Sequence, residues 1–459
     1  MERVDIAVVG GGPAGARAGE LAAEHDADVI VLEKGVPRAD RPVLGPDSTD
    51  AAGMLDYWVD ILDIPFDEIP DEIVLRELTG SQFIGPTETC ELTQTGIDAS
   101  YDGFGFTFHR ARMDDWLRDR AESAGADYRV GTSVSSVDSE IGDGHRHRLS
   151  LADGSEIEAE YLICADGPQR TVTLSVLDQF LSDTSAADVM GPRASNHIAY
   201  QEYRRIPEEL YEPDLLKFWW GYIPGETAYP WIFPNDDNVA RVGLTMPMAI
   251  DLGEISDRDA YALLESDDET VPSGAVYLRR LLEYEYGEEY VIESDFPLVQ
   301  DRGKRGGTEA YAISSTRPIE SPTTAGVAIV GGAMGTTSAF HEGGYHVAAR
   351  TGAIAGELAA TDQLSRYNSE WHRAIGDEIL RNVSFAEIVK EYGPSDWDRA
   401  FAIANRMIGG DGNDGQLIRR RLTAGVGAMR ILWRYRRMKR RFRNGNYVKL
   451  RESAYDYSS

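Results

Sequence analysis

Residues 4–15 read Val-Asp-Ile-Ala-Val-Val-Gly-Gly-Gly-Pro-Ala-Gly. The apolar run at 4–9 predicts a buried parallel strand, and the glycines that follow predict a tight turn. A helix rich in small residues is expected from Ala14 to Glu24, and a second strand from Asp28 to Glu33. Strand, glycine-rich turn, helix and strand in this order are what a dinucleotide-binding site requires.

Each glycine of this turn has its own task. Gly10 permits the tight turn, Gly12 lets the backbone approach a pyrophosphate, and Gly15 lets the helix pack close to the strand. The free N–H groups at the helix N-terminus favour the phosphates. Glu33 ends the second strand and can accept hydrogen bonds from an adenosine ribose. These residues alone predict NAD as readily as FAD.

The rest of the chain alternates between two patterns. Short alternating stretches at 81–84 and 89–92, and aromatic-rich alternation over 180–310, are typical of an antiparallel sheet with one packed face. A helix is expected from Phe108 to about Ser123, and a hairpin around Asp153-Gly154. The first pattern then resumes with a parallel-type strand, a loop and a helix, at 326–330, 331–335 and 344–360.

Composition narrows the function class. The net charge is −31, so the main body of the chain is not expected to bind nucleic acid. Only six of the 46 basic residues are lysines, which favours a halophilic source over an ordinary acidic protein. Cys90 and Cys164 have no metal-site or disulfide spacing. With no run of 18 apolar residues and no leader before the first strand, we expect a cytoplasmic chain.

One segment has the opposite charge. Residues 416–451 hold thirteen Lys or Arg and no acidic residue, and apolar residues such as Ile431-Leu432-Trp433 interleave with them. This pattern predicts a basic amphipathic helix. It either lies on an anionic membrane surface, which would make the protein peripheral on the inner face, or docks on the acidic body of its own chain.

Four segments together resemble the geranylgeranyl reductase family, a branch of the p-hydroxybenzoate hydroxylase-like FAD enzymes. They are the Gly10–Gly15 loop with Glu33, the helix Arg110-Ala-Arg-Met-Asp114-Asp-Trp-Leu117, Ala165-Asp166-Gly167, and Val330–Gly335 with Gly343-Gly344. The resemblance implies that FAD is the cofactor and that it contacts Gly10, Gly12, Pro13, Ala14, Gly15, Glu33, Lys34, Arg110, Val134, Asp166, Gly167, Gly331, Gly332, Gly343 and Gly344.

A fifth segment narrows the resemblance. Tyr229-Pro-Trp231-Ile-Phe233-Pro234, followed by Gly243, is similar to the aromatic element of prenyl reductases. In that family the aromatic residues line the cavity for the isoprenoid chain. The resemblance implies an isoprenoid lipid or prenylquinone substrate that contacts Tyr222, Tyr229, Trp231 and Phe233.

The chain departs from the family pattern at three positions. Gly332 stands where the family has an Asp that bonds the ribityl chain, and Thr245 stands where a glycine is expected. The reactive Cys turn of the family appears here as Arg41-Pro-Val-Leu-Gly45, with Leu44 in place of the Cys. A mechanism that uses this thiol is therefore excluded.

We expect a mixed α/β and α+β fold. A discontinuous Rossmann-type FAD-binding domain is assigned to residues 1–75, 101–175 and 312–365. An antiparallel-sheet substrate domain is assigned to 76–100 and 176–311. A helical C-terminal region spans 366–459 and contains the basic tail 416–451.

Reduction of an isolated double bond needs a hydride and a proton, so an acid is expected beside the flavin. His341 and Glu342 precede the last Rossmann helix and are the candidate catalytic residues, although His341 can equally pack or cap this loop. No second glycine-rich dinucleotide motif follows a strand. NAD(P)H, a ferredoxin or a quinol therefore remain open as electron donor.

Other functions fit some of the same motifs. A flavin-dependent monooxygenase or halogenase would share the first three, and a quinone-linked dehydrogenase or a lycopene-cyclase-like enzyme is related in fold. A degenerate flavoprotein that acts as a lipid-binding module at the membrane surface is the alternative without catalysis, and Gly332 is its best support.

Overall fold

The computed structural model describes residues 1–36, 53–142, 144–191, 196–255, 257–302, 306–314, 316–408 and 425–457. The turn at 41–45 that carries Leu44, and residues 416–424 of the basic segment, lie outside these ranges.

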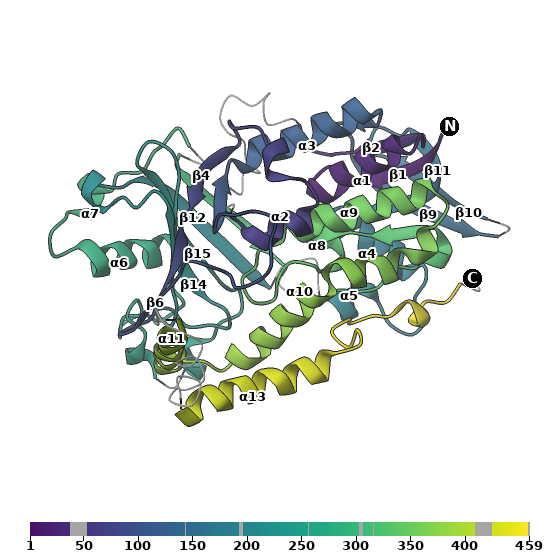
Figure 1. Ribbon diagram of the computed structural model, residues 1–459. Helices are drawn as coiled ribbons and strands as arrows, with labels where there is room; N and C mark the ends of the chain where they lie inside the picture. Colours follow the sequence, from purple (N-terminus) through teal and green to yellow (C-terminus); the bar gives the residue numbers. More distant parts are fainter. Residues whose placement is uncertain are drawn as a thin grey trace.

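The first sheet is the predicted Rossmann sheet (Figure 1). Its strands run in the order β8 (Asp127–Arg129), β2 (Val29–Leu32), β1 (Glu2–Val9), β11 (Glu156–Cys164), β10 (His145–Leu151) and β9 (Val134–Ile141), with β17 (Val327–Ile329) beside β11. Pairing is parallel between β1 and β2, β1 and β11, β2 and β8, and β11 and β17. It is antiparallel between β9 and β10 and between β10 and β11. The carboxyl ends of β1, β2, β11 and β17 therefore meet at one edge, which is where open α/β sheets bind ligands.

Helices surround this sheet, and small residues allow two of them to come into close contact. The helices are α1 (Pro13–Glu24), α2 (Asp56–Leu62), α3 (Arg110–Ala124), α4 (Thr171–Asp178), α5 (Ala186–Met190), α8 (Gly331–Met334) and α9 (Tyr345–Ala360). A Cβ on Gly352 of α9 would lie 1.9 Å from the Ala14 carbonyl oxygen, so α1 and α9 touch backbone to backbone. The loop predicted at 331–335 is wrong in part, because its first four residues form the short helix α8.

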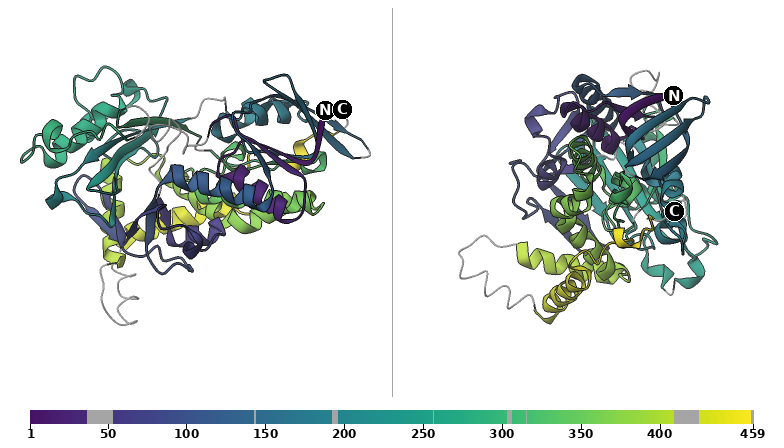
Figure 2. Two further views of the ribbon diagram at one scale, coloured as in Figure 1. Left: turned by 90° about the horizontal axis from the view of Figure 1, so that it is seen from above. Right: turned by 90° about the vertical axis from the view of Figure 1, so that its right-hand side faces the viewer.

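The second sheet holds the remaining long strands (Figure 2). Its order is β16 (Thr308–Ile313), β12 (His197–Arg205), β15 (Val239–Pro247), β14 (Tyr229–Pro234), β13 (Leu215–Trp219), β5 (Gly80–Ile84) and β6 (Thr89–Leu92). The pairing is antiparallel, as expected, except between β13 and β5, which are parallel. A small third sheet contains β3 (Gly53–Leu55), β7 (Gly105–Phe108) and β4 (Val74–Leu78). The mixed fold class is confirmed, and the domain bounds stay a prediction.

The two faces of the second sheet differ. Val242 and Leu244 pack with α6 (Gly274–Tyr286) on the outer face, near α7 (Ile292–Asp295). Because side chains alternate along a strand, Gly243 and Thr245 face the other way. Gly243 is paired with Trp231, and a Cβ on Gly243 would lie 2.4 Å from the Trp231 indole. The glycine is needed there because the indole covers it.

The C-terminal region is helical, as predicted. It contains α10 (Tyr367–Val389), α11 (Pro394–Ile408) and α13 (Gly425–Phe442), and α13 runs along α10 (Figure 1). After α13 the chain returns to the Rossmann domain, where the Lys449 N–H donates to the Pro318 carbonyl and the Tyr455 hydroxyl donates to the Glu320 carbonyl. The basic segment is therefore anchored in the fold at its C-terminal end.

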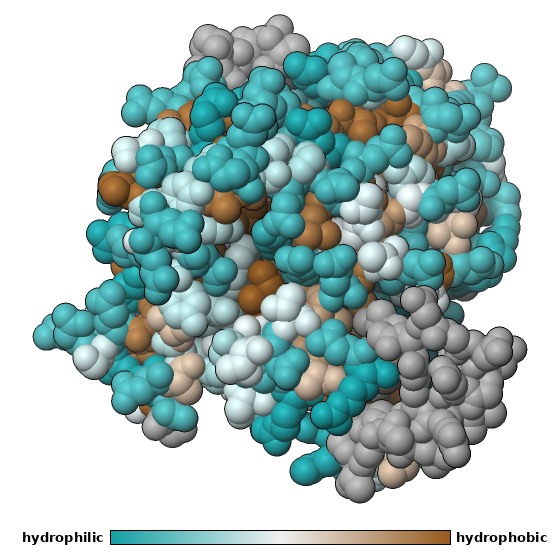
Figure 3. All heavy atoms as spheres, turned by 60° about the vertical axis from the view of Figure 1, so that its left-hand side comes forward, coloured by the Kyte–Doolittle hydropathy of each residue, from teal (hydrophilic) through white to brown (hydrophobic). Residues whose placement is uncertain are grey.

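The outer surface is largely polar. The face in Figure 3 is mainly hydrophilic, with hydrophobic residues in separate patches. None of the helices in the described ranges has the length and apolar character needed to cross a membrane.

Replacing Gly243 by Ala should destabilise the protein. The new methyl group would overlap the buried Trp231 ring, and overpacking of this kind costs about 1–3 kcal/mol of unfolding free energy. Gly142→Ala is the matched control, because a Cβ there meets no atom within 4 Å. Equal unfolding midpoints for the two variants would contradict this packing.

Candidate active site

A cavity of about 1030 Å³ lies between the carboxyl edge of the first sheet and the inner face of the second. Gly10, Gly12 and Asp166 line it at one end, and Trp231 and Phe233 line it at the other. Ligand pockets in proteins are commonly about 300–1,000 Å³. This cavity is at the upper limit, as expected of a site that takes both a dinucleotide and a substrate.

Most of the predicted cofactor residues line this cavity. They are Gly10, Gly12, Pro13, Ala14, Glu33, Lys34, Arg110, Val134, Asp166, Gly167, Gly332, Gly343 and Gly344. Gly15 and Gly331 do not line it and act through packing instead. A Cβ on Gly15 would lie 1.8 Å from the Gly10 carbonyl oxygen, and one on Gly331 would lie 3.0 Å from the Ala14 Cβ.

The residues at the glycine-rich turn fit a dinucleotide. Gly10 has a φ of +102°, which favours glycine, and a Cβ on Gly12 would meet no atom within 4 Å. Open space therefore lies in front of the Gly12 backbone at the N-terminus of α1, where phosphates are favoured. The Glu33 carboxylate accepts the N–H groups of Gly11 and Gly35, both at 2.6 Å. Its remaining lone pairs can accept hydroxyl groups from a ribose.

Arg110 and Asp166 are held by their own neighbours. Arg110 Nε donates to the buried Asp114 carboxylate at 2.8 Å, and its guanidinium lies 4.6 Å from the centre of the Tyr345 ring. This explains the spacing of four residues in the motif, because positions i and i+4 share a helix face. The Asp166 carboxylate accepts the Val172 and Thr173 N–H groups, so it orders the start of α4. Burial raises the pKa of Asp166.

An Asp at position 332 would need Pro168 to shift by a few tenths of an ångström. A Cβ at this position would lie 3.3 Å from Cδ and N of Pro168. Arg170 also donates to the Gly332 carbonyl, which fixes the backbone. Gln169 and Thr171, on the facing segment, line the cavity and carry polar groups close by. No sequence pattern pointed to these two residues.

The inner face of the second sheet forms an aromatic wall. Tyr229, Trp231 and Phe233 of β14 line the cavity together, as period-two spacing predicts. Phe218 and Trp220 also line it, and the Trp220 and Tyr229 rings stack with centroids 4.3 Å apart. Sequence reasoning missed these two, although Leu216, Phe218 and Trp220 have the same period-two spacing.

The structure does not bring Tyr222 to this cavity. Its ring lies in the core that includes Tyr277 and Leu281 of α6, and its hydroxyl donates to the Gly85 carbonyl at 3.3 Å. The prediction of substrate contact is corrected for this residue, because Tyr222 follows β13 and packs toward the outer face of the sheet.

Glu342 is a buried carboxyl group at the cavity wall. Its side chain is 3% exposed, and the hydroxyl of Thr245 donates to Oε2. The Thr227 hydroxyl, at 3.5 Å, and His197 Nε2, at 3.4 Å, face Oε1. Burial raises the pKa of Glu342 to about 8, and the hydrogen bond that Thr245 donates only partly opposes this. The carboxyl group therefore keeps its proton at neutral pH.

His341 lines the cavity, but both of its ring nitrogens have partners. Nδ1 accepts the Gly343 N–H at 3.1 Å, and Nε2 lies 3.6 Å from Glu378 Oε1 and 3.3 Å from Asn382 Nδ2. Burial opposes ionisation of Glu378, but the contact with His341 and the nearby Arg381 guanidinium outweigh it and hold the pKa below its usual value. Between the two candidate acids, this geometry favours Glu342 and gives His341 a role in holding the loop.

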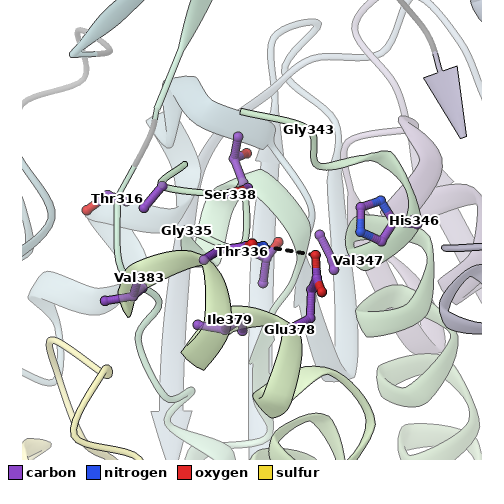
Figure 4. A pocket seen from close by; sticks show the side chains of 13 residues that line it. Thr316, Gly335, Thr336, Ser338, Gly343, His346, Val347, Glu378, Ile379 and Val383 are labelled. Carbon is purple, nitrogen blue, oxygen red and sulfur yellow. Dashed lines mark hydrogen bonds between the residues drawn. The ribbon is translucent and has the colours of Figure 1, made fainter. Parts of the chain in front are cut away.

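A second cavity lies behind this loop and is too small for a substrate. It has about 10 Å³ of space and is enclosed by residues of the 335–339 segment, α9 and α10 (Figure 4). Glu378 and Ile379 of α10 lie at its lower side in Figure 4. The Asn382 side chain donates to Glu378 Oε1 at 2.9 Å. The large cavity is therefore the candidate site.

The relatives of this chain are lipid reductases. Digeranylgeranylglycerophospholipid reductase 2 of Methanothermobacter thermautotrophicus is 25% identical over 407 residues, which cover 86% of this chain and 90% of the relative. The corresponding reductase of Methanocella arvoryzae is 25% identical and covers 84% and 87%. The resemblance to the geranylgeranyl reductase family is confirmed. The prediction of an FAD-dependent oxidoreductase of geranylgeranyl reductase type is confirmed with it.

Solved structures place this geranylgeranyl reductase-like chain in a wider fold. A geranylgeranyl bacteriochlorophyll reductase-like protein from Thermoplasma acidophilum has a TM-score of 0.67 and 19% identity, and covers 95% of this chain and all of the other. The flavin-dependent halogenase CmlS has a TM-score of 0.58 and 16% identity, with coverage of 92% and 77%. Residues 84–192 also match the tryptophan halogenase family. FAD is the cofactor that these comparisons support.

Replacing Gly12 by Val should abolish tight FAD binding without unfolding the protein. The new side chain would extend into open cavity space where the phosphates approach, and φ of −73° suits any residue. We expect at least tenfold weaker FAD binding by fluorescence titration and an unchanged apoprotein melting temperature. Unchanged affinity would place the cofactor elsewhere.

Proposed function

We propose that this protein is an FAD-dependent reductase that saturates double bonds in the isoprenoid chains of a prenyl lipid or prenylquinone. The observation that carries the proposal is the single cavity that joins the glycine-rich turn to the aromatic wall, with the Glu342 carboxyl at its side. Bound FAD in its reduced form supplies the hydride. The residues of the chain supply orientation, exclusion of water and the proton.

The aromatic wall suits a substrate without polar groups. Trp231 and Phe233 are less than 9% exposed, and further apolar rings from Phe218 and Trp220 extend the same surface. Burial of apolar surface contributes about 25 cal/mol per Å², so a long hydrocarbon chain gains binding free energy along the wall without any hydrogen bond. The names of the relatives, which are reductases of a glycerophospholipid with geranylgeranyl chains, support this substrate class.

Glu342 is the proposed proton donor. An isolated double bond does not stabilise negative charge, so a proton must arrive with the hydride. Glu342 lies in the loop that leads into α9, and its Oε2 contacts Thr245 of β15, so it bridges the two ends of the cavity. Its pKa of about 8 keeps it protonated at neutral pH. Leu44 stands where the family has its reactive thiol, so this proposal assigns the acid to Glu342 instead.

The direct test is a single-turnover reaction without a natural electron donor. Purified protein with FAD reduced by dithionite, mixed anaerobically with a geranylgeranyl glycerolipid, should yield product heavier by two hydrogens for each saturated bond. The matches to halogenases support one rival reaction. Oxygen consumption with a hydroxylated or halogenated product, and no saturation, would favour that rival.

Replacing Glu342 by Gln should slow this single turnover about 10²–10⁴-fold, the range found for loss of a positioned acid. In the wild type the rate should fall as pH rises through about 8, when Glu342 loses its proton, and the variant should lack this limb. Glu226→Gln is the matched control, because that half-buried carboxyl group does not line the cavity.

The same substitution has a stability consequence that needs no FAD. The pKa of Glu342 is raised from an ordinary value of 4.5, so its contribution to stability is full below pH 4.5 and is lost as pH rises toward 8. The unfolding free energy of the wild type, relative to Glu342→Gln, should fall over this window. A constant difference would show that the carboxyl ionises normally.

We also propose that α13 holds the protein on an anionic lipid surface at the inner face of the membrane. Met429, Leu432 and Trp433 are 63%, 47% and 60% exposed, and arginines such as Arg430 and Arg436 are exposed beside them. The opposite face packs on the protein, where Tyr435 stacks on Phe385, a cavity residue, at 4.8 Å. The helix therefore docks on its own chain and still presents a basic, apolar face near the substrate.

The double substitution Leu432→Ser with Trp433→Ser should weaken binding to vesicles of anionic phospholipid at least tenfold. Salt at 1 M shortens the Debye length to about 3 Å, so apolar insertion must supply most of the affinity there. Val291→Ser is the control, because Val291, at 63%, is as exposed as Trp433 but lies at the N-cap of α7 and not on α13. Equal co-sedimentation of all three proteins would exclude α13 as the contact.

A further inference from the structure

A polar cluster lies behind Glu342, on the side away from the cavity. His197 at the start of β12 and Thr227 just before β14 are buried and do not line the cavity, whereas Glu342 and Thr245 do. His197 Nε2 lies 3.4 Å from Glu342 Oε1 and 3.3 Å from the Thr227 hydroxyl. The Glu342 carboxyl is therefore placed between His197 and the substrate space.

The backbone at this cluster is strained. Glu342 has a φ of +59° and Thr227 a φ of +53°, both in the left-handed region. For a β-branched residue such as Thr227 this conformation is a genuine outlier. Such strain persists where the surrounding structure holds it, and it concentrates at functional sites. The two strained residues, Thr227 and Glu342, contact each other through the Thr227 hydroxyl and Glu342 Oε1. This indicates a site under functional constraint rather than ordinary core packing.

The surroundings of His197 decide its tautomer. The Thr227 hydroxyl donates to the Glu226 carbonyl, so the Thr227 oxygen is left to accept from the ring. Nε2 thus faces three oxygen atoms, from Glu226 at 3.1 Å, Thr227 and Glu342, and carries the ring proton. Nδ1 keeps a lone pair, and it is buried without a hydrogen-bond partner among the described residues.

The other titratable groups near Glu342 stay neutral. Burial raises the pKa of Tyr229 and of Tyr311, so neither ionises near neutral pH. The Glu226 side chain points toward Lys390, at 3.9 Å, and is 42% exposed. Burial lowers the pKa of His197, so its ring is neutral while Glu342 is protonated. Within the described residues, His197 is the group in contact with Glu342 that can become positive.

We propose that His197 returns a proton to Glu342 after each reduction, an inference that rests on the proposed function. The Glu342 O–H bond breaks as the new C–H bond forms on the substrate, which leaves a buried carboxylate. A proton that originates in solvent then reaches the lone pair of His197 Nδ1, and the imidazolium pairs with the carboxylate. The Nε2–H bond breaks as the Oε1–H bond forms. Proton exchange with solvent restores the starting tautomer.

Infrared titration of the apoprotein tests the first half of this inference. The protonated carboxyl band of Glu342, assigned by its loss in Glu342→Gln, should titrate near pH 8. In His197→Gln its midpoint should rise, because the carboxylate loses the ring N–H that faces Oε1 at 3.4 Å and stabilises the charged form. His147→Gln is the matched control, because His147 is also a buried histidine but lies on β10 of the first sheet.

Kinetics test the second half with the FAD-loaded protein. In His197→Gln the multiple-turnover rate should fall at least tenfold more than the single-turnover rate, because only repeated turnover needs a new proton on Glu342. Imidazole added to His197→Ala should restore multiple turnover. A merely structural role for His197 would slow both rates alike and would give no rescue.

A measurement on the wild type covers the case in which the His197 variants fail to fold. Nitrogen-15 spectra of the histidine rings should show the His197 signals shifting with the same midpoint as the Glu342 band, because ionisation of Glu342 changes the charge 3.4 Å from His197 Nε2. Glu342→Gln should remove that midpoint. Separate midpoints for His197 and Glu342 would overturn this inference and leave the reductase proposal standing. The same holds if the Glu342 midpoint does not move in His197→Gln and imidazole does not rescue His197→Ala. A Glu342 midpoint near 4.5 would overturn the roles of both residues.

Discussion

Backbone contact at the carboxyl edge of the first sheet is the constraint on which the rest depends. A Cβ on Gly10 would lie 2.3 Å from the Ala165 carbonyl oxygen, and one on Gly352 would lie 1.9 Å from that of Ala14. These glycines hold β1, β11, α1 and α9 at distances that no side chain permits. The position of α9 then fixes the loop before it, and that loop carries Glu342 to the inner face of the second sheet.

The same loop brings a buried carboxyl group into an apolar cavity, which is costly unless the group stays neutral. Glu342 meets this condition by keeping its proton, and the Thr245 hydroxyl stabilises its position. Gly243 and Thr245 lie two residues apart on β15 and face the same way. The first makes room for Trp231, and the second bonds the acid. The departure from the family at Thr245 is thus linked to the acid in this site.

The basic segment and the acidic main body differ in charge, as the composition suggested, but they are packed together in one structure. The basic segment is helical in α13, and its end is built into the Rossmann domain through residues such as Tyr447 and Leu450. Docking on its own chain is seen on one face of α13, and the proposed membrane contact would use the opposite face of the same helix. The docked face reaches the wall of the cavity through the contact of Tyr435 with Phe385.

The sequence determined much of this by local physics. The glycine spacing at 10–15, the terminal acid Glu33 and the period-two aromatics of β14 each depend on backbone geometry within one or two elements, so strands, turn and sheet face were predictable. Tyr222 was misplaced because its position after β13 turns it to the outer face, and Phe218 and Trp220 were missed for want of a known partner strand. Only the tertiary structure could place His197, Thr227 and Thr245 around Glu342. They are distant in the chain, and burial, which raises the pKa of that carboxyl, exists only once the two sheets have closed on it.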